Sequence, residues 1–249
     1  FKVQDDYCQV PKIRYETVTI TLKNKEMLPP TEIDCITVDE NDDVTINWTQ
    51  TTDPNGVFEG YEIHRIGDGV VGLVADINTT SFAIPGDGVA QQDYTVAVLS
   101  GCDGGGRSYS DTVSNIFLEL NNPGNGEALL NWNDPIDPPM NHFGSYYHIY
   151  SEYPAGNWTL IDSVPYGETT YRDTITICEG FINYRVELPT SRCDFVSNIE
   201  GDTFEDNIVP DIPEIFSADI DLTSGDVTVT WDENGQEDTY GYVVYTLDA

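Results

Sequence analysis

The strongest constraint on this chain is a strand-like segment that recurs three times, each copy ending in tryptophan. Alternate residues of each copy are apolar, which is typical of a β-strand with one face on a hydrophobic core. The copies are Val44–Trp48, Ala128–Trp132 and Val227–Trp231. Each is followed by a loop rich in Asp, Pro, Asn and Gly. The pattern therefore predicts a tandem array of one β-sheet unit.

A second strand follows each loop and begins with tyrosine. Tyr61, Tyr147 and Tyr242 follow the tryptophans at spacings of 13, 15 and 11 residues. Further on, Tyr94–Val98 matches Tyr184–Leu188, and each is followed by a turn with a cysteine. The remaining β-rich runs are Gly69–Ile77, Ser81–Ile84, Trp158–Val164 and Thr170–Tyr171. No run of ten residues has helical periodicity with caps, so the sequence predicts an all-β protein.

These landmarks divide the chain into four parts. We expect the C-terminal strands of an upstream module at 1–28, complete modules at 29–115 and 116–207, and the first strands of a further, incomplete module at 208–249. Prolines mark the boundaries at Leu28–Pro30 and Ile208–Pro213, where they stiffen the connection and cannot join a central strand. Val113–Leu118 runs from one module to the next without a breaker, which predicts the stiffest junction there.

Seven short strands in ~90 residues, with Trp on the second and Tyr on the sixth, are typical of an immunoglobulin-like sandwich of the fibronectin type III kind. The chain also resembles the fibronectin-type modules of large Bacteroidota surface proteins that use type IX secretion and gliding-associated C-terminal sorting domains. The resemblance rests on Pro213–Tyr245, on Trp158–Asp162 with Thr169–Asp173, and on Tyr184–Cys193 with Val196–Asn198. It implies a secreted protein at the outer membrane surface. The family's sorting domain is absent from this stretch.

Acidic residues dominate the charge of the chain. It has 44 Asp and Glu against 10 Lys and Arg, a formal charge of −34. Such a field repels phosphates, so nucleic acid is excluded as an expected partner. Other modules of the same protein, an extracellular protein or glycan, and the secretion or surface-attachment machinery remain as expected partners.

The five cysteines indicate disulfides, because the chain has no C-x-x-C pair and its three histidines are scattered. In a fibronectin-type sandwich the first strand begins at the pole that holds the loop between the sixth and seventh strands. Cys35 is therefore expected to bond to Cys102. Cys178 and Cys193 are the remaining pair, which requires the loop after Cys178 to double back. Cys8 is left for a partner upstream.

Acidic clusters offer oxygen ligands of the kind that Ca²⁺ prefers. The best candidate is the linker, where Asp202, Glu205, Asp206 and Asp211 would bind calcium between units. A chain this acidic also forms such clusters by composition alone, and solvated turns are the alternative. Calcium is the only cofactor that the sequence suggests.

Two kinds of modification signal occur. Asn-x-Thr sequons lie at Asn47, Asn78 and Asn157. The Bacteroidota resemblance implies a different glycosylation rule, Asp followed by Ser or Thr and a small apolar residue, with attachment at Thr112, Ser163 and Thr174. Ordinary strand-edge hydroxyl residues are the alternative for these short motifs.

The sequence contains no signature of catalysis. It has no Gly-x-Ser-x-Gly elbow, no phosphate loop and no dinucleotide fingerprint, so no catalytic residue is expected. Trp48, Trp132 and Trp231 fall on the inward register and are expected in cores. Trp158, in a loop region with Tyr153, is instead a candidate for contact with a glycan or protein, with packing as the alternative.

The sequence thus predicts a non-enzymatic structural or adhesive rod segment of a large secreted cell-surface protein, which spaces or presents a binding region. Two alternatives stay open. The modules are accessory parts of a secreted multidomain hydrolase, or the chain is a subunit of an extracellular filament built by strand completion.

Overall fold

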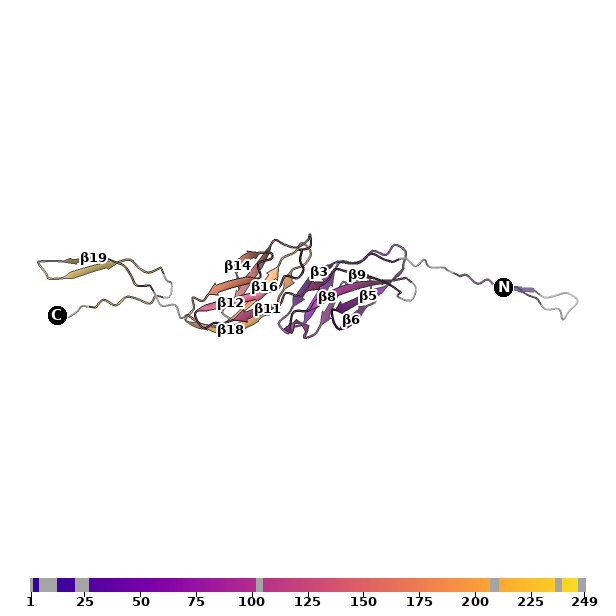
Figure 1. Ribbon diagram of the computed structural model, residues 1–249, viewed down its shortest axis with the longest axis horizontal. Coiled ribbons are helices and arrows are strands. Elements are labelled where there is room, and N and C mark those ends of the chain that lie inside the picture. The colour runs from indigo at the N-terminus through magenta and orange to yellow at the C-terminus, as the bar shows by residue number, and fades with distance from the viewer. Residues whose placement is uncertain are drawn as a thin grey trace.

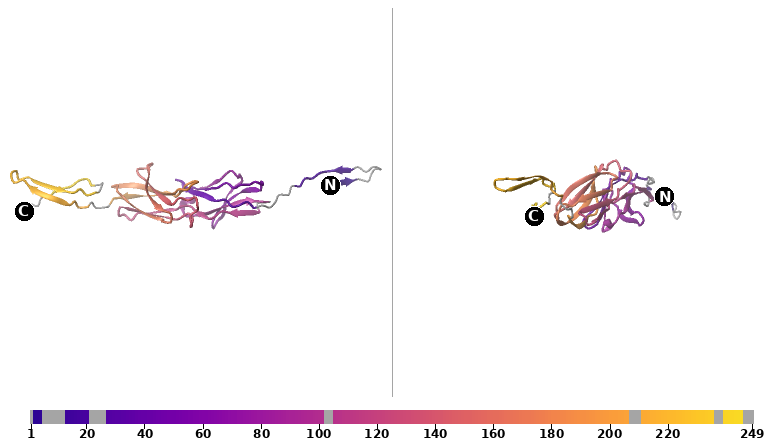
Figure 2. Two further views of the ribbon diagram at one scale, coloured as in Figure 1. Left: turned by 90° about the horizontal axis from the view of Figure 1, so that it is seen from above. Right: turned by 60° about the vertical axis from the view of Figure 1, so that its left-hand side comes forward.

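In the computed structural model, which describes residues 2–4, 13–20, 27–101, 105–206, 211–235 and 239–245, almost all regular structure is β-strand. Two sandwiches lie next to each other in the middle of an elongated molecule, and a two-stranded hairpin lies at each end (Figures 1 and 2). We call residues 27–115 the first sandwich and residues 116–206 the second sandwich. The predicted all-β fold is confirmed. The described residues contain no helix able to span a membrane.

The first sandwich has a layer of three strands and a layer of five. The strand orders are β3-β4-β7 and β10-β8-β5-β6, and β9 also pairs with β8. Its strands are β3 (Ile33–Val38), β4 (Val44–Trp48), β5 (Phe58–Arg65), β6 (Gly69–Val74), β7 (Ser81–Ile84), β8 (Asp93–Ser100), β9 (Gly106–Tyr109) and β10 (Val113–Ser114). A short 3₁₀ helix at Asp87–Val89 precedes β8.

The second sandwich repeats this plan. The orders are β11-β12-β15 and β14-β13-β16-β17, and β18 pairs with β16. Its strands are β11 (Leu118–Asn121), β12 (Glu127–Trp132), β13 (Tyr146–Glu152), β14 (Trp158–Pro165), β15 (Thr170–Thr174), β16 (Glu179–Leu188), β17 (Phe195–Val196) and β18 (Glu200–Glu205).

Two of the three repeated tryptophans, with their tyrosines, form the cores of the sandwiches as the alternating pattern predicts, whereas Trp231 of the end hairpin is only half-buried. Trp48 and Tyr61 are buried with ring centroids 5.2 Å apart, and Trp132 meets Tyr147 at 5.6 Å. Aromatic pairs edge to face at this separation add to the burial of their area. The hydroxyl groups are satisfied too, since Tyr61 accepts the backbone N–H of Thr51 at 3.0 Å.

The hairpin at each end of the molecule is a sheet of only two described strands. β1 (Lys2–Gln4) pairs with β2 (Ile13–Tyr15), and β19 (Ile215–Ile220) pairs with β20 (Val227–Trp231). Trp231 meets Tyr242 at 5.6 Å, as in the two sandwiches. The strand expected at Tyr242–Tyr245 is not formed, because the described residues place no strand beside it and an extended segment needs a neighbour for its backbone hydrogen bonds.

Candidate functional site: the joint between the sandwiches

The two sandwiches share one sheet. β17 of the second sandwich pairs in parallel with β3 of the first, with Val196 opposite Thr37. The strand order β14-β13-β16-β17-β3-β4-β7 therefore runs from one sandwich into the other. Even a single backbone pairing between sandwiches resists bending more than a flexible linker does, because bending breaks hydrogen bonding that the sheet otherwise satisfies.

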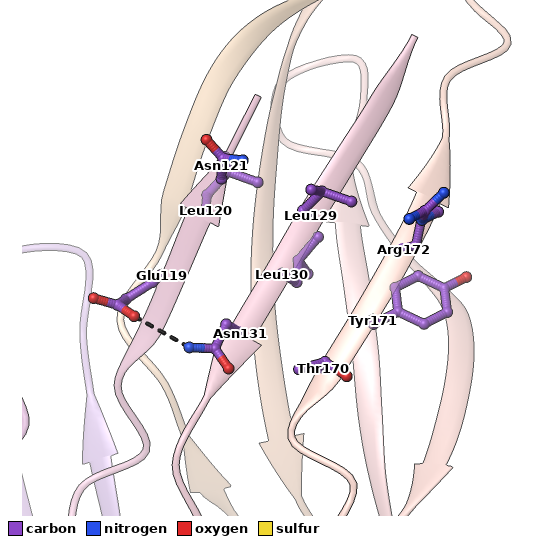
Figure 3. A pocket seen from close by; sticks show the side chains of 9 residues that line it. All are labelled: Glu119, Leu120, Asn121, Leu129, Leu130, Asn131, Thr170, Tyr171 and Arg172. Atoms are coloured by element: carbon purple, nitrogen blue, oxygen red, sulfur yellow. Dashed lines mark hydrogen bonds between the residues drawn. The ribbon is translucent and has the colours of Figure 1, made fainter. Parts of the chain in front are cut away.

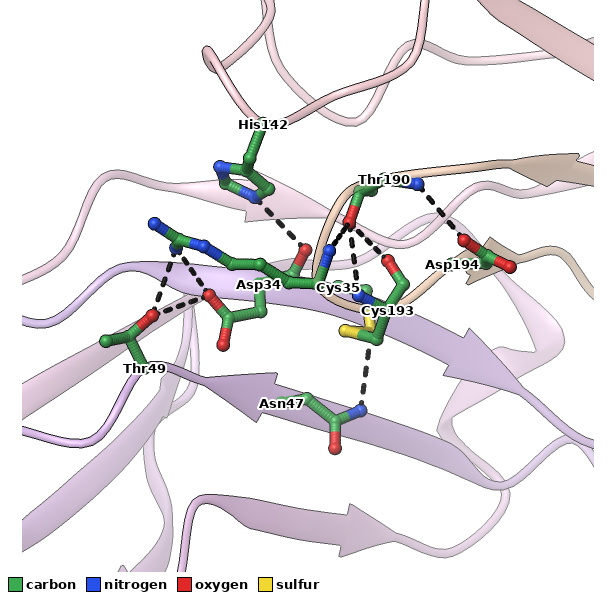
Figure 4. Close-up of a disulfide and its surroundings, with 9 residues drawn as sticks. Asp34, Cys35, Asn47, Thr49, His142, Thr190, Cys193 and Asp194 are labelled. Carbon is green, nitrogen blue, oxygen red and sulfur yellow. Dashed lines mark hydrogen bonds and ion pairs between the residues drawn. A yellow bond between two sulfur atoms is a disulfide. The ribbon is translucent and has the colours of Figure 1, made fainter.

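A disulfide closes the joint beside this strand pair (Figure 4). Cys35 on β3 bonds to Cys193 in the loop before β17, with the Cα atoms 5.8 Å apart and a sequence separation of 158. The Cys35 side chain is fully buried, and Asn47 Nδ2 donates a hydrogen bond to its sulfur at 3.5 Å. The bond links the two sandwiches covalently.

The predicted pairing of Cys35 with Cys102 is therefore wrong. The prediction assumed that Cys35 faces its own sandwich. A register shift after Ile33 places Ile33 opposite Trp48 but Cys35 opposite Asn47, so Cys35 lies off the core register and meets the neighbouring sandwich. Cys102 and Cys8 lie outside the described residues.

The predicted bond between Cys178 and Cys193 is wrong for a simpler reason. Cys178 is free and exposed at one end of β16, while Cys193 follows its other end. Ten strand residues span roughly 33 Å at 3.3 Å per residue, far beyond the reach of a disulfide.

Charged groups support the disulfide. Arg192 Nη1 lies 2.8 Å from Glu32 Oε2, 2.6 Å from Asp34 Oδ1 and 3.0 Å from Thr49 Oγ1. His142 Nε2 lies 3.2 Å from the backbone oxygen of Asp34 (Figure 4). The hydrogen bonds to Asp34 and Glu32 raise the pKa of Arg192. Each pair stabilises by less than about 1 kcal/mol, but together they join a cation of the second sandwich to two carboxylates of the first.

Backbone contacts fix the connecting segment at a second point of the joint. Ser114 N donates to Pro135 O at 2.8 Å, and Asn133 Nδ2 donates to Asn115 O at 2.9 Å. Asn115 is fully buried, and its side-chain oxygen accepts the N–H of Gln92 at 2.7 Å. These contacts agree with the stiff junction that the unbroken Val113–Leu118 segment predicts.

The carboxyl group of Glu200 lies at the joint in surroundings that disfavour its ionised form. Burial raises the pKa of Glu200, and the nearby charges of Asp42 in the first sandwich and Glu119 in the second raise it further. Asn198 Nδ2 donates to Glu200 Oε1 at 3.0 Å and partly compensates. The ionised form of Glu200 therefore destabilises the joint.

Replacing this carboxyl by an amide, Glu200→Gln, is expected to stabilise the protein by up to about 1 kcal/mol at neutral pH. A raised folded-state pKa means that the charged form costs stability above that pKa. The gain should vanish as the pH falls below the ordinary value of 4.5, where the group is protonated in both states. Urea denaturation at neutral and acidic pH measures it. Glu205→Gln, at an exposed position of β18, is the control, and an equal gain there would contradict the assignment.

The second sandwich has a surface hollow on the strands that correspond to those carrying Cys35 in the first sandwich (Figure 3). It lies on β11, β12 and β15 and has a volume of about 660 Å³. Glu119 accepts from Asn131 Nδ2 at 3.2 Å, and these residues pair across the strands as Cys35 and Asn47 do in the first sandwich. Glutamate thus occupies the position of the bonded cysteine, and this position cannot form a disulfide. The lining residues contain no cysteine, histidine or serine.

The predicted calcium ligands are not gathered. The described residues contain no group of three or more His, Cys, Asp or Glu side chains that could hold a metal ion. Asp202 lies on β18 and accepts a hydrogen bond from Asn122 Nδ2 at 3.2 Å. Glu205 ends β18, whereas Asp211 begins the next described segment. Calcium binding at this linker stays a prediction.

The other predicted residues are dispersed. Thr112 and Thr174 are exposed at strand ends, and Ser163 Oγ lies 2.7 Å from His148 Nδ1 on the neighbouring strand. That Ser–His contact has no third member among the described residues, because the nearby Glu187 pairs with Arg185 at 2.8 Å. Glycosylation at Thr112, Ser163 and Thr174 stays a prediction.

Trp158 and Tyr153 lie on different surfaces. Trp158 begins β14 and stacks with Arg185, whose Cζ is 4.5 Å from the ring centroid. The Tyr153 ring lies close to Gly180, on the inward side of β16 at the sandwich end. Phe181 and Arg185, which extend the surface around Trp158, have no motif in the sequence. Their alternation with buried residues of β16 was the signal that marked them as outward-facing.

Comparisons with known proteins give likeness to solved structures only. No protein-family model matches the chain, and no curated protein does. The chain is similar to the central fibronectin-III array of RIM-binding protein, with 16% identity over 82% of this chain and 79% of that one and a TM-score of 0.28. It is also similar to the FN1–FN3 domains of chicken CNTN1, with 13% identity over 72% and 68% and a TM-score of 0.29. The fold assignment rests on the strand pairing of this chain, which is that of tandem fibronectin type III-like β-sandwiches.

Proposed function

We propose that this chain is a non-enzymatic rod segment of a large secreted cell-surface protein, in which the two sandwiches act as one stiff spacer that holds a binding region away from the surface. The single observation that carries the proposal is the joint, with its continuous sheet and the disulfide between Cys35 and Cys193. An array with flexible linkers would let its ends approach each other, whereas a closed joint keeps them apart.

The disulfide also supports the proposed location. Such bonds persist in oxidising compartments and are rare in the cytosol. The Bacteroidota-like module motifs of the sequence support export to the outer membrane surface within the same proposal. The partners proposed are the neighbouring modules of the same protein and an extracellular protein or glycan.

Distance measurement between the sandwiches tests the rod. Spin labels carried by non-natural residues at the exposed positions Gln91 and Glu168 leave the cysteines untouched. Double electron–electron resonance on the oxidised chain is expected to give one narrow distance distribution. A broad distribution, typical of two sandwiches on a flexible linker, would refute the stiff spacer.

A further inference from the structure

The outer face of β13, β14 and β16 in the second sandwich carries a set of side chains that the joint does not use. Cross-strand pairing arranges them in two rows. The first row is Leu160, Tyr150 and Arg185, and the second is Trp158, Glu152 and Asn183. Phe181, two residues before Asn183 on β16, continues the surface. We call these seven residues the aromatic face. Leu160 is 51% exposed and Phe181 57% exposed, so the face is apolar and open to solvent.

Its rings are held in place by their neighbours. The Arg185 guanidinium lies over both Trp158 and Tyr150, with its Cζ 4.5 Å and 5.2 Å from the two ring centroids. Such cation–π contacts fix the rings and the guanidinium relative to each other. Arg185 Nη2 also pairs with Glu187 at 2.8 Å, so the charge of the only cation on this face is neutralised.

Phe181 is held in a similar way by a glycine. A Cβ at Gly201 would lie 2.8 Å from the ring of Phe181, so the ring packs directly against the β18 backbone. Asn183 Nδ2 donates to Glu152 Oε2 at 2.6 Å, which lowers the pKa of Glu152 and keeps it an ionised acceptor. The exposed Phe181 ring and the half-buried Trp158 ring thus lie beside polar groups that are already oriented.

A cavity of about 280 Å³ borders the face where the first sandwich meets it. Arg185 lines it together with the turn Asp39–Asn41 of the first sandwich. Arg185 Nε is buried without a hydrogen-bond partner among the described residues. A buried donor of this kind is stabilised by an acceptor oxygen, and the volume is close to the lower end of the ~300–1,000 Å³ usual for ligand pockets.

We propose that the aromatic face binds a neutral polysaccharide. The C–H faces of sugar rings pack on Phe181 and on the side of Trp158 that Arg185 leaves uncovered, while sugar hydroxyls bond to Glu152 and Asn183. Charge selects against acidic chains, since the protein has a formal charge of −34 and Arg185 is already paired. The inference rests on the proposed function, because it names the ligand class that the rod presents.

The first sandwich lacks this face. Counted from the core tyrosines Tyr61 and Tyr147, His64 stands where the second sandwich has Tyr150. Counted from Tyr94 and Tyr184, Thr95 stands where it has Arg185. There Glu62 accepts from Arg107 at 2.8 Å and lies 3.2 Å from His64, whose ring meets Tyr109 edge to face at 5.3 Å. Binding is therefore expected at the second sandwich only.

Affinity electrophoresis of the full chain tests the proposal, with β-glucan, xylan and galactomannan as neutral probes and polygalacturonate as the acidic one. At least one neutral polysaccharide is expected to retard the wild-type chain. Trp158→Ala and Phe181→Ala are each expected to weaken that binding about tenfold or more. Phe181→Tyr keeps a flat ring and should retain it. Leu73→Ala, an exposed apolar position of the first sandwich, is the matched control.

Three outcomes would overturn the proposal. They are retardation by polygalacturonate alone, retardation that both alanine variants leave unchanged, and no retardation by any probe while circular dichroism shows a folded chain. None of them affects the distance distribution between Gln91 and Glu168, so the failure of the glycan site and the failure of the stiff rod are distinguished.

Discussion

Replacing Cys35 and Cys193 together by serine is expected to cause the largest loss of stability of any change at the joint. The disulfide closes a loop of 158 sequence positions. In the chain-entropy model a loop of that length contributes about 5 kcal/mol, which is an upper value because the mechanism and the strain vary between proteins. Without the bond, the two sandwiches are expected to unfold in two separate transitions instead of one. Calorimetry measures both the midpoints and the number of transitions.

The control for this change is the cysteine that the joint does not use. Cys178 is free and exposed, so Cys178→Ser should leave the calorimetric profile as it is. Wild-type protein under reducing conditions should behave like the Cys35→Ser, Cys193→Ser double variant. A double variant with the single transition and midpoint of the wild type would show that the disulfide does not couple the sandwiches.

Trp48→Ala is expected to have the other large effect, a loss of about 3–5 kcal/mol from the free energy of unfolding. Trp48 is 2% exposed and meets Tyr61 at 5.2 Å, so the change leaves a cavity and removes an aromatic contact. Urea denaturation followed by circular dichroism measures the loss. The first sandwich should unfold at lower urea concentration than the second.

Leu73→Ala is the comparison for this prediction, since Leu73 is also large and apolar but is 67% exposed on β6. Surface changes of this kind stay within about 0.5 kcal/mol. Equal losses for Trp48→Ala and Leu73→Ala would mean that the tryptophan is not a core residue.

The fold was predictable from the sequence because the core positions repeat. The period of two in Val44–Trp48 and Val227–Trp231 marks strands β4 and β20, which the structure confirms at those bounds. Ser81–Ile84 is likewise confirmed as β7. Such patterns report which face of a strand is buried, and burial within one sandwich depends mostly on local sequence.

The joint was not predictable in the same way. Whether Cys35 faces its own core depends on the register shift after Ile33, and no residue pattern marks that shift. Its partner Cys193 lies in the other sandwich, so the pairing depends on how two folded units meet. The sequence could propose only pairings within a unit.

The aromatic face was predictable in part. Trp158 stood out because it lies outside the repeated core pattern. Its neighbours Arg185 and Phe181 are brought to it by the pairing of three strands, with a register shift between Ile149 and Tyr150. Neighbours across strands depend on register, and a shift of one residue moves a side chain to the other face.

Tryptic peptide mapping of the unreduced chain tests the central claim most directly. Cleavage after Arg65, Arg107, Arg172, Arg185 and Arg192 leaves Cys35, Cys102, Cys178 and Cys193 on four different peptides. The closed joint predicts one linked species that joins the peptide with Cys35 to the peptide with Cys193 and separates on reduction. A species that joins Cys35 to Cys102 instead would place the bond inside the first sandwich and contradict the joint.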